Sequence, residues 1–186
     1  AKRQELAMPA RLYSIANFMR YERPQRGRER EFWQLNADLF GVDGSAADAE
    51  IIELSHASVM NFGAKQEMFT VRVNNRQLIN RLMSQFLKLD IVGSTMMMKL
   101  LDRKNKILAE EFKRQAIEIF GSQASEGLPK LAKMISMKSV DDLPSELMED
   151  ESVKQLREVM KLLSQKGITN AVFDVTLMRG LDYYTG

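Results

Sequence analysis

The sequence has no cysteine and a single histidine among its 186 residues. The absence of cysteine excludes disulfides, thiolate zinc sites, iron–sulfur clusters and cysteine nucleophiles. The single histidine, His56, excludes a metal site with two imidazole ligands and leaves one possible base for a triad of the Ser-His type. No apolar run approaches the ~20 residues of a membrane span. Residues 1–5 also lack the apolar core of a signal peptide, so we expect a cytoplasmic protein without membrane contact.

The small net charge of +2 conceals two segments of opposite charge. Residues 11–30 contain six arginines and two glutamates, whereas residues 141–160 contain seven acidic residues and two basic ones. Arginine presents a planar fork of donors that fits phosphates and carboxylates. The basic segment therefore indicates either a loop that binds a polyanion or an ordinary solvated loop, and charge alone leaves both open.

The order of strands and helices predicts an α+β fold. Aromatic and apolar residues at 11–22 and 31–40 predict an antiparallel hairpin, with Pro24 and Gly27 in its basic tip. Further strands are expected at 67–73 and 170–177, and helices at 45–60, 76–89, 94–104, 107–120, 125–136 and 149–165. Strands at both ends and helices in the middle predict a mostly antiparallel sheet with a helical insertion.

The second strand of the hairpin has two different faces. One face carries Trp33, Leu35, Ala37 and Leu39, and we expect it to pack in the core. The other face carries Phe32, Gln34, Asn36 and Asp38. Gln34 and Asp38 should lie about 13 Å apart along the strand. Such a row either lines a pocket for a small polar ligand or is the solvated face of an antiparallel sheet.

Two further groups of residues are candidates for chemistry. Arg20 and Glu22 share a face of the first strand near the hairpin tip. There Arg20 could hold a phosphate or carboxylate, or form a cross-strand ion pair worth at most about 1 kcal/mol. The segment RGLDYYTG at 179–186 is a candidate turn at the edge of a site. The chain contains no glycine-rich phosphate loop of the GxxxxGK[ST] or GxGxxG type.

Three stretches of this sequence resemble motifs of the histidyl-tRNA synthetase family. FMRYERPQRGR at 18–28 and FWQLNADLFG at 32–41 resemble its motif 2, and RGLDYYTG resembles its histidine-binding motif. The resemblance implies a class II aminoacyl-tRNA synthetase core, built from antiparallel strands and flanking helices, at 1–74 and 156–186. It implies a helical insertion at 75–155. It also implies ATP-dependent conversion of histidine to histidyl-adenylate, with Mg²⁺, and transfer to tRNA(His).

The resemblance assigns roles to the residues that match these motifs. It implies that Arg20 and Arg179 are catalytic. It implies that ATP is bound by Arg20, Glu22, Arg28 and Phe32, and that histidine is bound by Gln34, Asp38, Arg179, Tyr183 and Tyr184. It also implies that Arg23 and Gln25 contact the acceptor end of the tRNA. No metal ligand from the protein is implied. Many members of the family have Glu at the position of Asp38 and His at that of Trp33.

Other parts of the family's machinery have no match in this sequence. Motif 1, which builds the dimer interface, would precede residue 1, and motif 3 and the anticodon-binding domain would follow Gly186. We therefore expect an internal segment of a homodimeric ligase, inactive in isolation. The alternative is a non-catalytic relative, such as the synthetase-like regulatory subunit of ATP phosphoribosyltransferase. Such relatives tend to lose the arginines matched by Arg20 and Arg179, so their presence favours the ligase.

Overall fold

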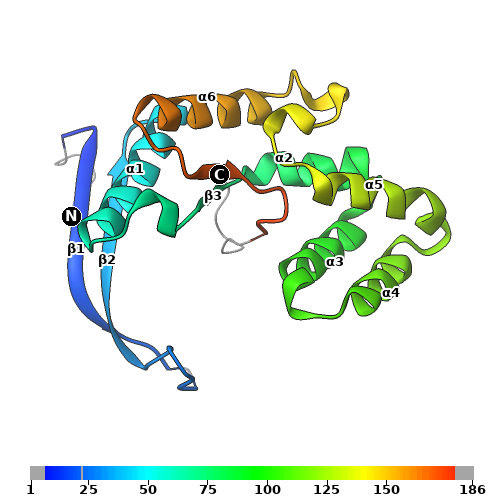
Figure 1. Ribbon diagram of the computed structural model, residues 1–186, viewed down its shortest axis with the longest axis horizontal. Coiled ribbons are helices and arrows are strands. Elements are labelled where there is room, and N and C mark those ends of the chain that lie inside the picture. Colours follow the sequence, from blue (N-terminus) through cyan, green and yellow to red (C-terminus); the bar gives the residue numbers. More distant parts are fainter. Residues whose placement is uncertain (1–6, 22, 179–186) are drawn as a thin grey trace.

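The computed structural model describes residues 7–21 and 23–178. Figure 1 shows a long two-stranded hairpin on one side, a block of helices on the other, and a short pair of strands between them. The hairpin consists of β1 (Ala10–Met19) and β2 (Glu31–Phe40), which pair antiparallel with Phe18 opposite Phe32. Strand β3 (Val71–Val73) pairs in parallel with β4 (Ala171–Phe173), although the two are about a hundred residues apart in the sequence.

The remaining elements are helical. The α-helices are α1 (Ser45–Asn61), α2 (Arg76–Arg81), α3 (Ile91–Asp102), α4 (Ala109–Phe120), α5 (Ala124–Ser136) and α6 (Glu151–Gln165). A π-helical segment, η3 (Leu82–Phe86), continues α2. Short 3-10 turns are η2 (Gln66–Met68), η4 (Lys104–Lys106), η5 (Gly121–Gln123), η6 (Val140–Asp142) and η7 (Ser145–Leu147). The predicted α+β class is confirmed, and the longer of the two strand pairs is antiparallel as expected.

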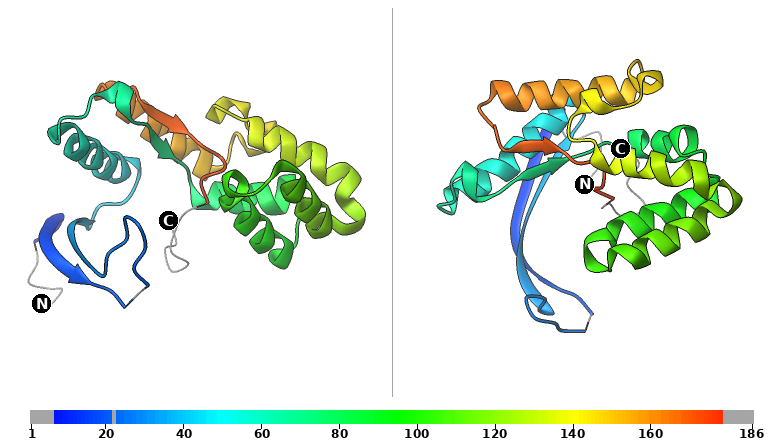
Figure 2. Two further views of the ribbon diagram at one scale, coloured as in Figure 1. Left: turned by 60° about the horizontal axis from the view of Figure 1, so that its bottom comes forward. Right: turned by 45° about the vertical axis from the view of Figure 1, so that its right-hand side comes forward.

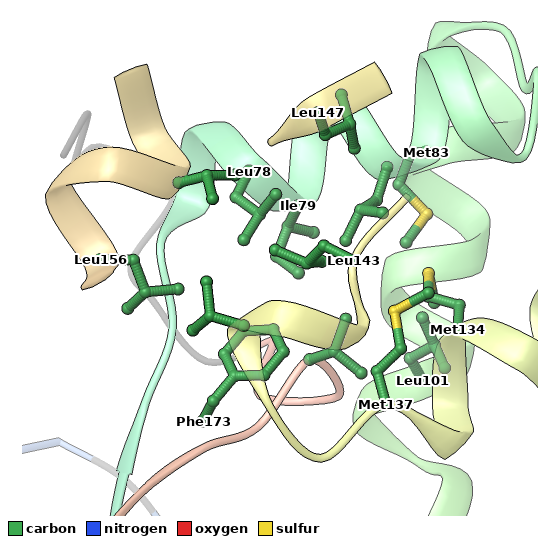
Figure 3. Packing of buried hydrophobic residues seen from close by; sticks show 14 of the residues in the cluster. Leu78, Ile79, Met83, Leu101, Met134, Met137, Leu143, Leu147, Leu156 and Phe173 are labelled. Carbon is green, nitrogen blue, oxygen red and sulfur yellow. The ribbon is translucent and has the colours of Figure 1, made fainter. Parts of the chain in front are cut away.

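One hydrophobic core joins the helices to the short strand pair. Figure 3 shows Leu78 and Ile79 of α2, Leu156 of α6 and Phe173 of β4 packed together with Met134 of α5. Residues on both sides of position 155 belong to this cluster, and α6 itself runs across that position. The expected limit of the insertion at 155 therefore falls within a helix whose apolar side packs in the common core.

The hairpin stands largely outside this core, which corrects one expectation. Figures 1 and 2 show it beside α1 and clear of α3, α4 and α5. Trp33 is 73% exposed and Leu35 is 48% exposed, although the alternation of β2 predicted a buried apolar face. The physical reason is that alternation identifies which residues share a face, whereas burial requires another element to cover that face. Arg11 forms an ion pair with Glu50 of α1, which connects this end of the hairpin to the helices.

The bounds of several elements also differ from expectation. The strand expected at 67–73 is a 3-10 turn followed by three residues of β3, and the strand expected at 170–177 is limited to 171–173. The helix expected at 76–89 changes from α to π after Arg81. Beyond β4 the backbone turns, because the carboxylate of Asp174 accepts hydrogen bonds from the amide and the hydroxyl of Thr176 and the strand ladder does not continue.

Candidate functional site

The tip of the hairpin places a cation against aromatic rings. The guanidinium carbon of Arg20 lies 4.4 Å from the centroid of the Phe32 ring, within the range of a cation–π interaction. The ring of Phe32 stacks on that of Phe18, with centroids 6.3 Å apart and planes inclined by 28°. Arg20 Nε donates to the Glu29 carbonyl at 3.0 Å, and the Arg20 amide donates to the Arg30 carbonyl at 2.8 Å. These contacts fix a half-buried positive charge on the polar face of the hairpin.

A cavity of about 650 Å³ lies at this point of the hairpin. Its walls include Arg20, Phe32 and Gly27, so the structure brings two of the expected ATP-binding residues to one hollow. Glu31 and Trp33, which alternation places on the opposite face of β2, also line the hollow. The hollow has the size of a small-ligand site, for which 300–1,000 Å³ is usual.

The polar row of β2 continues from this hollow on the same face. Gln34 Nε2 donates to Asn36 Oδ1 at 2.6 Å, which joins two of the three polar side chains. Across the hairpin, Ala16 lies opposite Gln34 and Ser14 lies opposite Asn36. Leu12 lies opposite Asp38, and none of the three polar residues lines the hollow. No role was predicted for Asn36 from the sequence, although its position between Gln34 and Asp38 on the same face would have indicated a place in the same polar row.

The loop at the tip carries Arg23 and Gln25, which were expected to contact the tRNA, and Arg28, which was expected to bind ATP. The backbones of Gln25 and Arg28 exchange two hydrogen bonds, at 2.8 and 3.0 Å, which close a tight turn. Gly27 supplies the left-handed conformation of that turn, with a φ of 74°. Arg23, Gln25 and Arg28 are all exposed around this turn.

Four of the predicted site residues lie outside the described residues: Glu22, Arg179, Tyr183 and Tyr184. The described chain ends at a turn formed by residues 174–178, just before the predicted histidine-binding motif. Figures 1 and 2 show this turn between the hairpin and the helices α3 and α4.

Asp174 organises this turn. Its Oδ1 accepts from the Thr176 hydroxyl at 2.7 Å and from the Thr176 amide at 2.9 Å. Its Oδ2 accepts from Arg72 Nη1 of β3 at 3.0 Å. Burial alone would raise the pKa of Asp174, but the hydrogen bonds from Thr176 and the charge of Arg72 outweigh burial and lower it. The sequence analysis missed this residue, because the segment was predicted to be a strand; the Asp-x-Thr spacing was the signal of a turn.

The described residues contain no cluster of three His, Cys, Asp or Glu side chains that could hold a metal ion. The one histidine, His56, is buried in α1 with its ring 5.2 Å from that of Phe69, and its Nε2 has no hydrogen-bond partner. No helix within the described part of the chain is long and apolar enough to cross a membrane.

Comparison with solved structures identifies the fold. The chain superposes on the crystal structure of histidyl-tRNA synthetase from Nostoc sp. PCC 7120 with a TM-score of 0.76. The two share 22% sequence identity, and the match covers 98% of this chain and 44% of the other. The fold, with its hairpin and short parallel strand pair, is therefore that of the matched part of this synthetase.

Sequence comparisons give the family. The family model described as histidyl-tRNA synthetase matches residues 1–186, and the chain belongs to this family. It is 38% identical over 191 residues to the histidine–tRNA ligase of Thermococcus kodakarensis, and 32% identical over 188 residues to that of Leptospira biflexa. These matches cover 98% and 100% of this chain, but only 42% of each relative. The chain thus spans about two fifths of the length of the relatives it matches.

Proposed function

We propose that the chain is the part of a histidine–tRNA ligase that holds ATP and histidine during formation of histidyl-adenylate. The main support is the placement of Arg20 on the Phe32 ring, on the same face of the hairpin as Gln34 and Asp38. The guanidinium of Arg20 and the aromatic ring of Phe32 suit the binding of a nucleotide at one end of the row. The amide of Gln34 and the carboxylate of Asp38, farther along the strand, suit the binding of a small polar ligand.

In the proposed reaction the histidine carboxylate attacks the α-phosphorus of ATP. A bond forms between a carboxylate oxygen and phosphorus, the bond to the bridging oxygen breaks, and pyrophosphate leaves. Negative charge builds on the α-phosphate oxygens and on the leaving group. Arg20 and Arg179 would stabilise this charge from two elements, and Arg28 would contact the distal phosphates. The reaction needs no covalent nucleophile from the enzyme, which agrees with the absence of cysteine and the burial of His56.

The other assignments follow the residues of the hairpin. Phe32 would stack on the adenine ring and Glu22 would contact its edge. Gln34 and Asp38 would line the histidine pocket, with Tyr183 and Tyr184. Mg²⁺, when bound, neutralises phosphate charge. The described residues offer no carboxylate cluster to hold Mg²⁺, so the phosphates of ATP would be its ligands at this site.

The same proposal places the tRNA acceptor end at the exposed tip, near Arg23 and Gln25. The helical insertion at about 75–155 would contact the acceptor arm, through a side other than the acidic segment 141–160, because phosphates repel that charge. The parent protein would be a cytoplasmic homodimer.

The experiment compares the chain with the full-length protein that contains it. Full-length protein should catalyse histidine-dependent exchange of pyrophosphate into ATP, and the isolated chain should not. No exchange by folded full-length protein would reject the ligase and favour a non-catalytic, histidine-sensing relative. Exchange by the isolated chain at the rate of the full-length protein would show that the adenylate site needs nothing beyond these residues.

A further inference from the structure

Asn36 holds the amide group of Gln34 on the polar face of the hairpin. Asn36 Oδ1 accepts a hydrogen bond from Gln34 Nε2 at 2.6 Å. The residues next to Gln34 on the same face, Phe32 along the strand and Ala16 directly opposite, have no polar side-chain atoms. Gln34 is exposed, whereas Asn36 is half-buried. The amide of Gln34 is therefore bonded to the protein on one side and accessible to a ligand on the other.

This bond decides which end of the Gln34 amide is turned away from Asn36. The terminal torsion of glutamine has a broad, roughly two-fold preference, so an unbonded amide presents its oxygen or its nitrogen with similar ease. Oxygen and nitrogen diverge from the same carbon, so a nitrogen directed at Asn36 turns Oε1 away from it. An amide held in this way offers an acceptor to a ligand, since one of its two donors is already used.

Asp38 favours the same orientation of Asn36. It is the next residue of β2 on this face, about 7 Å farther along the strand. A carboxylate only accepts hydrogen bonds, and its negative charge attracts the nitrogen end of the Asn36 amide and repels the oxygen end. The oxygen end is then left to accept from Gln34, as it does in the structure. The orientation of both amides is thus set from the Asp38 end of the row.

We propose that Asn36 is a positioning residue that makes Gln34 a hydrogen-bond acceptor for the histidine substrate. The proposal rests on the histidine-binding role proposed above for Gln34. Free histidine carries N–H donors on its ammonium group and on its imidazole ring, and an amide oxygen suits either of them. Asn36 acts through Gln34 and does not itself touch the substrate. Without Asn36, Gln34 presents its nitrogen to the substrate donor in part of the molecules, which weakens histidine binding.

The test uses the full-length ligase and pyrophosphate exchange, with kcat and KM for histidine and ATP measured separately. Asn36→Ala removes the acceptor and should raise the KM for histidine about fivefold, the effect of one modest hydrogen bond. Its kcat and its KM for ATP should stay within twofold of wild type, because only histidine binding changes. Asn36→Asp retains an acceptor oxygen and should keep the KM for histidine within twofold. If Asn36→Ala does not fold, Asn36→Val, which suits a strand and also lacks the acceptor, replaces it.

Ser14 provides a matched control on the same face of the hairpin. It lies directly opposite Asn36 and also has a polar side chain. Ser14→Ala therefore removes a polar group beside Asn36 without removing the acceptor of Gln34, and it should leave all three constants within twofold of wild type. An equal rise in the KM for histidine in Ser14→Ala and Asn36→Ala would attribute the effect to the general polarity of this face and overturn the proposal.

A double-mutant cycle with Gln34→Glu tests whether Asn36 acts through Gln34. A glutamate presents oxygen at both positions of its carboxylate, so it needs no partner to select the acceptor. Asn36→Ala should therefore raise the KM for histidine less than twofold in the Gln34→Glu background. An equal rise in both backgrounds, or none in either, would overturn the proposal and leave the ligase function intact. An inactive but folded wild-type protein would overturn the proposal together with the ligase function itself.

Discussion

Arg20 and Phe32 form a stacked pair across the hairpin, with the guanidinium carbon 4.4 Å from the ring centroid. A cation over an aromatic face contributes about 0.5–2 kcal/mol, depending on how far it is desolvated. The bond from Arg20 Nε to the Glu29 carbonyl sets the orientation of the planar fork. The pair thus presents a positive charge in a fixed direction on the face that also carries Gln34.

Replacement of this arginine should affect the chemical step more than histidine binding. In the full-length ligase, Arg20→Ala should lower the single-turnover rate of adenylate formation by about 10²–10³, because a preorganised donor to developing charge is lost. Arg20→Lys should recover only part of the rate, since it keeps the charge but loses the fork. Arg11→Ala removes an arginine from the same hairpin and should leave the rate unchanged. If Arg20→Ala remains folded and within fivefold of wild type, Arg20 is not catalytic.

The sequence pattern predicted the hairpin well and its surroundings poorly. The strand expected at 31–40 is β2, because apolar and polar residues alternate from Trp33 to Leu39 and Gly41, with a φ of 77°, follows the end of the strand. The pattern also placed Phe32 and Gln34 on one face, as the pairing requires. It could not predict the exposure of Trp33, since the burial of a sheet face depends on distant residues that local periodicity does not include.

Side-chain hydrogen bonds explain the other differences. Asp174 ends β4 early, because its carboxylate bonds to Thr176 in competition with a strand ladder. The helix α1 has no side-chain cap, and the hydroxyl of Ser45, its first residue, donates to the Gln155 carbonyl of α6 at 3.2 Å. The bond from Thr176 is local, and the Asp-x-Thr spacing indicates it. The bond from Ser45 and the ion pair of Asp174 with Arg72 join residues about a hundred positions apart, so no local pattern could predict them.

Gly127 of α5 packs directly beneath the buried ring of Phe120. A Cβ at this position would lie 2.6 Å from Phe120 Cγ, which is far inside van der Waals contact. Helix propensity favours alanine over glycine by ~1 kcal/mol, but overpacking typically costs ~1–3 kcal/mol. We therefore expect Gly127→Ala to lower the free energy of unfolding in urea by about 1 kcal/mol. In a Phe120→Leu background the same change should cost less, and equal costs in both backgrounds would contradict the contact.

Lys88 follows η3 in a left-handed conformation, with a φ of 57°. The turn is closed by a bond from the Leu89 amide to the Met83 carbonyl at 3.0 Å. A left-handed conformation costs an L-residue ~1–2 kcal/mol, and glycine avoids this cost but loses more chain entropy on folding. Lys88→Gly should therefore raise the free energy of unfolding by about 0.5–1 kcal/mol. Lys99→Gly, at an exposed position within α3, should lower the free energy of unfolding by ~1 kcal/mol. A change of the same sign in both variants would contradict the role of the left-handed conformation at Lys88.

Asp150 connects α2 to α6 and should make stability depend on pH. It accepts from Ser152 at the start of α6, and its Oδ2 lies 2.7 Å from Arg81 Nε. The hydrogen bond from the Ser152 hydroxyl is the main cause that lowers the pKa of Asp150, and the charge of Arg81 adds to it.

A lowered pKa in the folded state means that the stabilisation is complete above the pKa of the unfolded chain, ~3.9 for Asp. It is lost as the pH falls through the lower pKa of the folded state. Urea unfolding at a series of pH values should therefore show Asp150→Asn less stable than wild type by ~0.3–1 kcal/mol at pH 7, because the amide keeps a capping oxygen but loses the negative charge at the start of α6. The difference should shrink below about pH 4, where wild type also becomes neutral at this position. Asp43→Asn, in the exposed loop before α1, serves as the control. If the difference in stability between Asp150→Asn and wild type persisted unchanged into acid, the charge of Asp150 would contribute nothing to stability.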